Sequence, residues 1–146
     1  MTGKSVNPNR LSELGWLLDR LAEQVGHDTR AVLASLDGIT RCSSGLERDD
    51  AQKLGALGAS FLASSRSAAG VLGSDTADGA VRQFMVEHNE FLLFVMSAGH
   101  GTLLTVATSA DANAGTAGHE MAQLVKQVGE QLTTPHRAVP AVGGGE

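Results

Sequence analysis

Apolar side chains recur every three or four residues near both ends of the chain, which is the spacing of an amphipathic helix. The first series predicts a helix ending at Gly26, with Asn9 as a candidate cap; its apolar positions are Leu11, Leu14, Leu18, Leu21 and Val25. The second series predicts a helix over about 113–132; its apolar positions are Ala117, Met121, Leu124, Val125, Val128 and Leu132.

Between these helices, short apolar runs alternate with turn residues and predict five strands. The predicted strands cover residues 30–36, 39–44, 81–88, 91–97 and 102–109. Asp37-Gly38 and Asn89-Glu90 are expected to join neighbouring strands by tight turns, which makes those strands antiparallel. The pattern therefore predicts an α+β fold, in which helices cover a five-stranded antiparallel sheet.

Gly99, His100 and Gly101 fall between the last two predicted strands. A phosphate-binding loop would need a lysine and a following helix, and this segment has neither. Glycine supplies the positive φ that a tight turn requires. We therefore interpret the segment as a turn, rather than as a binding site built on His100.

Residues 48–72 predict one long helix, and its segment Leu54–Ser65 carries no charge. One series of positions is expected to pack on the sheet: Leu54, Leu57, Phe61, Ala68 and Leu72. A second series lies on the opposite face, where a helix usually presents charges to water. We call this second series the small-residue flank; its members are Gln52, Ala56, Ala59, Ala63, Arg66 and Gly70.

Two interpretations of the small-residue flank are open. One is a surface helix that is simply rich in alanine, the best helix former. The other is close packing against a second helix, since Gly55, Gly58 and Gly70 each cost about 1 kcal/mol relative to alanine. We favour the second, with another copy of the chain as the partner. The strand 81–88, with Arg82 and Phe84, is a candidate edge for the same contact, and a bulky charge at Ala59 is expected to split the dimer.

Composition narrows the class of protein. The 146 residues suit one domain, and the net charge is −5, with 11 lysines and arginines scattered along the chain. Nucleic-acid binding needs a dense positive surface, so it is not expected. A single cysteine, Cys42, fits a reducing compartment. No membrane-spanning run or signal segment is visible, and we expect a cytoplasmic protein without a cofactor.

The residues of common catalytic sites do not assemble into a motif. His119-Glu120 begins like a zinc-binding H-E-x-x-H, but Gln123 stands at the second histidine. Cys42 is best interpreted as a small buried hydrophobe. Asp49 and Asp50 are adjacent and diverge on a helix, which makes them a poor acid–base pair. The sequence therefore predicts a protein that is not an enzyme.

Four segments resemble the roadblock family, also called the dynein light-chain-like family, and in particular its actinobacterial branch. They are ELGWLLDRLAEQV at 13–25, the segment 35–70, FLLFVMSAGHGTLLTV at 91–106 and HEMAQLVKQVGEQLT at 119–133. The resemblance covers nearly the whole predicted domain, 11–133. We expect residues 1–10 to form a flexible tail, and 134–146 a disordered tail rich in proline and glycine.

The resemblance implies that the first and last helices lie on one face of the sheet and the long helix on the other. It also implies a homodimer that pairs long helices and joins edge strands into one continuous sheet. Members of the family are non-enzymatic partners of small Ras-like GTPases, acting as activators or scaffolds. In the actinobacterial branch a sensor kinase is a further implied partner.

A second hypothesis is a small-molecule sensor similar to PAS and GAF domains, which hold ligands between a sheet and its helices. The chain offers few polar groups to orient such a ligand and only five aromatic residues, so this alternative ranks second. A filled space between the helix 48–72 and the sheet would count against it.

Overall fold

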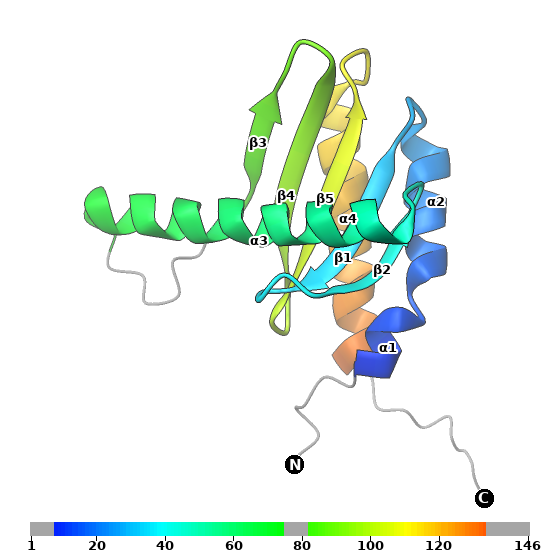
Figure 1. The fold of residues 1–146 in the computed structure, drawn as a ribbon, viewed down its shortest axis with the longest axis horizontal. Coiled ribbons are helices and arrows are strands. Elements are labelled where there is room, and N and C mark those ends of the chain that lie inside the picture. The colour runs from blue at the N-terminus through cyan, green and yellow to red at the C-terminus, as the bar shows by residue number, and fades with distance from the viewer. Residues whose placement is uncertain (1–7, 75–81, 134–146) are drawn as a thin grey trace, which may run out of the picture.

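The structure, a computed structural model, describes residues 8–74 and 82–133 (Figure 1). The elements follow one another as α1 (Pro8–Ser12), α2 (Gly15–Val25), β1 (Arg30–Ser35), β2 (Thr40–Ser44), α3 (Arg48–Val71), β3 (Phe84–Glu87), β4 (Phe91–Gly99), β5 (Thr102–Ser109) and α4 (Ala114–Thr133). Helix α1 begins inside the predicted tail 1–10, while residues 1–7 and the predicted tail 134–146 lie outside the described residues.

The five strands form one antiparallel sheet in the order β2-β1-β5-β4-β3. This confirms the predicted sheet. Among the described strands, β2 and β3 are its edges, as expected for the strand in 81–88. The described part of that strand is shorter than predicted, since β3 spans only Phe84–Glu87.

The predicted first helix is divided into two. Helix α1 ends at Ser12 and α2 starts at Gly15, so Asn9 lies within α1 rather than capping the longer helix. The leucine spacing continues across the break because both pieces bury their leucines in the same core. Gly26 ends α2 as predicted, with φ of +68°.

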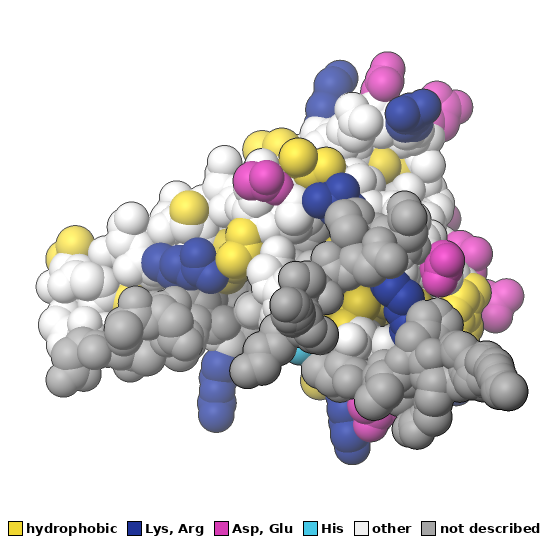
Figure 2. Space-filling model, turned by 90° about the horizontal axis from the view of Figure 1, so that it is seen from below, with side chains coloured by type: hydrophobic (Ala, Val, Ile, Leu, Met, Phe, Trp, Pro, Cys, Tyr) yellow, Lys and Arg dark blue, Asp and Glu magenta, His cyan; other side chains and the backbone are white. Residues whose placement is uncertain are grey.

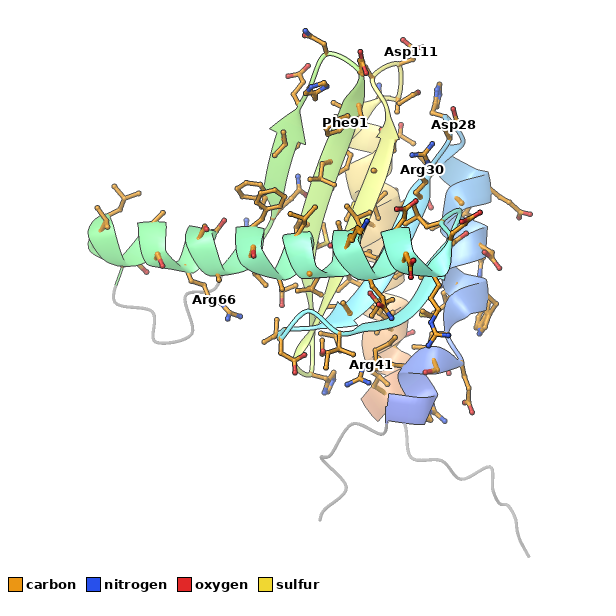
Figure 3. The ribbon with its side chains drawn as sticks, viewed as in Figure 1. Asp28, Arg30, Arg41, Arg66, Phe91 and Asp111 are labelled. Atoms are coloured by element: carbon orange, nitrogen blue, oxygen red, sulfur yellow. The ribbon has the colours of Figure 1, made fainter. Side chains whose placement is uncertain are left out.

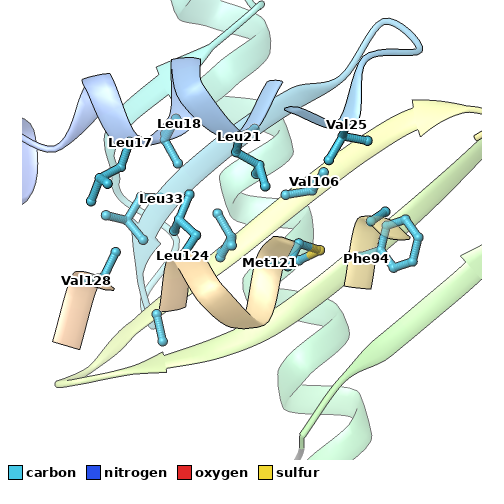
Figure 4. Close-up of a cluster of buried hydrophobic side chains, with 14 of the residues drawn as sticks. Leu17, Leu18, Leu21, Val25, Leu33, Phe94, Val106, Met121, Leu124 and Val128 are labelled. Carbon is cyan, nitrogen blue, oxygen red and sulfur yellow. The ribbon is translucent and has the colours of Figure 1, made fainter. Parts of the chain in front are cut away.

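Helices α2 and α4 cover one face of the sheet and α3 covers the other, as the resemblance implied (Figure 1). The larger core lies between α2, α4 and the sheet, where side chains from four segments far apart in sequence meet (Figure 4). Leu18, Leu33, Val106 and Met121 are fully buried there. The predicted final helix thus contributes its apolar face as expected.

The turn predictions hold as well. Residues 36–39 join β1 to β2, with the Ser35 amide donating to the Ile39 carbonyl at 2.9 Å. Gly99, His100 and Gly101 all have positive φ and connect β4 to β5. His100 is exposed at this turn, and its positive φ is explained by the reversal of the chain there.

Helix α3 contacts the sheet through a different side from the one predicted. Its buried residues are Ala51, Gly55, Gly58 and Leu62, whereas Leu57 is half exposed and Leu72 is almost fully exposed. A Cβ at Gly55 would lie 2.5 Å from the Thr40 hydroxyl oxygen, and one at Gly58 would overlap the Thr105 hydroxyl oxygen. Close packing does explain these two glycines, but the packing is against the chain's own sheet.

The helix is therefore rotated by about a quarter turn from the predicted orientation, since its sheet-facing residues are separated from the Leu57 side by roughly 100°. The physical reason is the short distance between the α3 backbone and the strands. At Gly55 and Gly58 there is no room for a side chain between the helix and the sheet, and Leu57 lies to one side. Thr40 also ties the two layers, since its hydroxyl donates to the Ala51 carbonyl at 3.0 Å.

Candidate functional site

Helix α3 is longer than the sheet that it crosses. Its 24 residues span about 36 Å, whereas five strands span about 19 Å between the two edge strands. The helix therefore projects past β3, as Figure 1 shows at the left. At the projecting end Val71 is 85% exposed and Leu72 is 83% exposed. Seen from below, the projecting part of α3 is mostly white with some yellow and carries few charged side chains (Figure 2).

An open groove of about 620 Å³ runs along one side of α3. Its wall is formed by α3 and its floor by β4 and β5, with β1 at the far end. Its large apolar lining residues are Leu46, Leu54, Leu57, Phe61, Phe91 and Leu93. Leu57 is 50% exposed and Phe91 is 38% exposed. We call this surface the α3 groove.

The α3 groove exists because α3 crosses the sheet and leaves the ends of β1, β4 and β5 uncovered. In Figure 3 the labelled residues Phe91, Arg30 and Asp28 lie on this uncovered part, above α3. Phe91 is held in place by the His88 ring, which stacks on it with centroids 4.3 Å apart. An exposed apolar floor bounded by a helix is a common form of docking surface for another helix.

Charges of both signs border the α3 groove. Asp28, Asp50 and Glu90 supply carboxylates, and Arg30 and Lys53 supply cations. The mixture produces no strong single-sign field that would select a highly charged ligand. The groove is therefore apolar at its centre and polar at its border, which is the usual composition of a protein–protein contact.

The small-residue flank lies on the other side of α3. Gln52, Ala56, Ala63 and Gly70 are exposed, as is Arg66, which points away from the groove in Figure 3. Ala59 is only partly exposed because the β1–β2 turn approaches it: a Cβ on Gly38 would lie 3.8 Å from the Ala59 methyl and 3.2 Å from the Ala56 Cα. A charge at Ala59 would thus disturb this turn as well as any interface.

The two predicted edge residues lie next to α3. Arg82 is exposed just before β3, and Phe84 is half-buried at its start. The Phe84 ring stacks on Phe61 of α3 with centroids 5.0 Å apart. The edge strand and the long helix therefore lie side by side at this point.

The side chains considered for chemistry are dispersed. His119 is exposed on α4 and His100 is exposed at the β4–β5 turn. Within residues 8–74 and 82–133 no group of three or more histidine, cysteine, aspartate or glutamate side chains is placed to hold a metal ion. Burial, together with the Asp19 carboxylate, raises the pKa of the Cys42 thiol to about 12, so this sulfur stays protonated at neutral pH.

The space between α3 and the sheet is filled in the described residues. Val32, Leu62, Val95 and Leu103 are fully or almost fully buried there, beside the two glycine contacts described above. This is the arrangement expected to count against a PAS-like or GAF-like ligand site. None of the described helices is long and apolar enough to cross a membrane.

The α3 groove itself was missed by the sequence analysis. Its lining residues are Asp28, Arg30 and Leu46, together with residues of α3, of 90–93 and of 107–109, so no local motif unites them. One signal was available: Ala51, Gly55, Gly58 and Leu62 are spaced four, three and four apart, which marks the sheet-facing side of the helix. That series leaves Leu57 and Phe61 to one side, beside the uncovered sheet.

Comparison with known proteins identifies the family. The Roadblock/LC7 domain profile matches residues 14–108. A Roadblock/LC7 domain from Streptomyces avermitilis is 42% identical, with a TM-score of 0.74 over 83% of this chain and 98% of that one. No curated protein sequence matches the chain.

Two more distant structures share the fold. MglB from Myxococcus xanthus has a TM-score of 0.69 at 17% identity, covering 88% of this chain and 91% of that one. The gliding protein MglB from Thermus thermophilus has a TM-score of 0.70 at 16% identity, covering 86% and 90%. The profile match over most of the folded chain, supported by the Streptomyces structure, shows that this chain belongs to the Roadblock/LC7 domain family.

Proposed function

We propose that the chain is a non-enzymatic homodimeric module that binds and regulates a small Ras-like GTPase in a signalling system. The single observation that carries the proposal is the exposure of α3 on both sides along its length, combined with its projection past the edge strand β3. A helix that packs only on its own sheet would present charged residues on its remaining faces. Here the exposed positions between Leu54 and Ser65 carry leucine, alanine and serine, and none of them is charged.

The homodimer accounts for the surface on α3 and β3 together. The candidate contact residues are Gln52, Ala56, Ala59, Ala63, Arg66, Gly70, Arg82 and Phe84, all of which belong to the α3 flank or to the β3 edge. An edge strand offers unpaired N–H and C=O groups that a second copy can satisfy. Joining two copies at β3 would cover that edge and bring both long helices together on the same face.

The GTPase follows from the family resemblance, and the geometry favours a particular mode of regulation. Arginine fingers insert a guanidinium into the nucleotide site and accelerate hydrolysis by roughly 10³–10⁵. The small-residue flank has one arginine, Arg66, and it is exposed on a helix rather than presented on a loop. We therefore propose that the dimer acts by ordering the switch loops of the GTPase, and not by supplying a catalytic side chain. A sensor kinase would be a second partner in the same cytoplasmic system.

A pull-down with a small Ras-like GTPase from the same genome tests this proposal. The purified chain is expected to retain the GTPase in one nucleotide state, GDP or a non-hydrolysable GTP analogue, in clear preference to the other. If it also activates hydrolysis, Arg66→Ala is expected to reduce the acceleration by less than about 10-fold, because no arginine finger is lost. Equal failure to bind in both nucleotide states would contradict the proposed partner.

A further inference from the structure

A second groove lies on the other face of the sheet, between α2 and α4. The two helices run in opposite directions, and Arg10, in α1, donates to the Gln131 carbonyl near the end of α4 (Figure 1). The groove between them measures about 220 Å³, and its floor is formed by the buried side chains of Leu17, Leu21 and Leu124. Small-molecule sites usually enclose roughly 300–1,000 Å³, so this space suits part of an extended chain better than a cofactor. We call it the α2–α4 groove.

The walls of the α2–α4 groove are polar. Their side chains are Arg20 and Gln24 of α2 and Glu120, Gln123 and Gln127 of α4. In the described part of the chain, none of the five makes a hydrogen bond or an ion pair. All five border one narrow space with an apolar floor. The groove therefore offers donors, acceptors and charges that a bound chain can use.

The glutamines have the spacing of an extended backbone. Gln123 and Gln127 are four residues apart on α4, which places them about 6 Å apart along the helix. In an extended chain, the N–H and C=O groups that point to one side recur every two residues, or about every 6.7 Å. Each glutamine amide both donates and accepts, so it can pair with both groups of one residue. Gln24, on the opposite wall, can pair with the residue between them.

The two charges of the groove add a requirement for side chains. The lining residues span 17–24 on α2 and 120–127 on α4, so Arg20 lies near the middle and Glu120 at one end. This offset is about 5 Å along the groove, close to the two-residue repeat of an extended chain. An acidic and a basic residue two positions apart would each lie beside the opposite charge. The residue between them would point toward the leucine floor, because side chains alternate in direction along an extended chain.

We propose that the α2–α4 groove binds an extended segment of another protein, in which an apolar residue is flanked by one acidic and one basic residue. The glutamine amides hold the backbone of this segment, and Arg20 and Glu120 select its side chains. Because α2 and α4 lie on the face of the sheet opposite α3, the proposal does not depend on the homodimer or on the GTPase. The chain can therefore join a further protein while α3 is occupied.

Panning a phage library of short random peptides against the full-length chain tests the proposal. The enriched peptides are expected to carry an apolar residue between two opposite charges. Trp16, the only tryptophan of the chain, is 53% exposed and one helical turn from Arg20, so its fluorescence reports binding of the synthetic peptides. We expect a saturable change in this fluorescence.

The double variant Gln123→Ala/Gln127→Ala is expected to weaken binding of these peptides by at least about 10-fold, because it removes the amides that pair with the backbone. Alanine is the best helix former, so α4 should persist, and circular dichroism checks this. The matched control is Gln52→Ala, which removes an exposed glutamine from α3 and is expected to bind like the unmodified chain.

Enrichment of no peptide above the unselected library would overturn the proposal. Peptides whose affinity is the same for the double variant and for the unmodified chain would overturn it as well. The double variant is expected to sediment like the unmodified chain, since its substitutions lie on the face opposite α3. A failure of peptide binding is therefore distinguishable from a failure of the proposed homodimer.

Discussion

Replacing Gly58 by alanine is expected to lower the free energy of unfolding by about 2 kcal/mol. Alanine normally stabilises a helix interior by about 1 kcal/mol relative to glycine, so the expected sign is opposite to that of helix propensity. The reason is that a Cβ at Gly58 would overlap the Thr105 hydroxyl oxygen and lie 3.2 Å from a Leu103 methyl. Overpacking of this kind typically costs 1–3 kcal/mol, and urea denaturation at fixed protein concentration would measure it.

Gly129→Ala is the matched control, because Gly129 lies within α4 and a Cβ there meets nothing within 4 Å. It is expected to raise the free energy of unfolding by about 0.5–1 kcal/mol. The double variant Gly58→Ala/Thr105→Ala provides a second check. Thr105 Oγ1 is buried without a hydrogen-bond partner in the described chain, so its removal should recover part of the loss. If the effects of the two substitutions on the free energy of unfolding were strictly additive, direct contact between these residues would be contradicted.

Leu57→Glu is expected to weaken the homodimer by roughly 10³-fold. Leu57 is half exposed in the single chain and belongs to the wall of the α3 groove. Covering an unpaired carboxylate there would cost on the order of 2 kcal/mol in each copy, and a symmetric dimer contains two such sites. About 4 kcal/mol corresponds to three powers of ten in the dissociation constant. Sedimentation equilibrium over a range of concentrations would measure the change.

Ala63→Glu places the same charge on the small-residue flank. Ala63 is exposed on the small-residue flank, clear of the turn that approaches Ala56 and Ala59. Because Ala63 is one of the proposed contact residues, this charge is expected to weaken the homodimer by at least about 10-fold. Circular dichroism should show both variants folded, since neither residue is buried. A dimer that resists both changes would contradict the proposed pairing of α3 between two copies.

The fold could be predicted from local patterns because most elements obey the rules of spacing and turn chemistry. Buried β1 and β5 are dense in apolar residues, and Gly38 and Gly101 take the positive φ values that their turns require. The break between α1 and α2 could not be predicted, because Leu11 and Leu14 continue the spacing of the leucines in α2 and all are buried together. The spacing of apolar residues shows which side chains are buried, but it does not show whether the helix is continuous.

The orientation of α3 could not be predicted from hydrophobic spacing because the usual rule places the largest apolar side chains toward the sheet. The close approach of helix and sheet reverses that rule here. Gly55 and Gly58 fit over Thr40 and Thr105, and Leu57 is displaced to the side. Gly55 and Gly58 do mark close packing, but their neighbour is the chain's own sheet and not the second helix that was predicted. The groove depends on that orientation and on strands far apart in sequence.

The central claim is that α3 is shared between two copies of the chain, and sedimentation velocity of the unmodified protein tests it most directly. At about 10–50 µM, a range in which a stable dimer with a submicromolar dissociation constant is fully associated, we expect one species with twice the chain mass of 15.1 kDa. A single species of 15.1 kDa across that range would contradict the account.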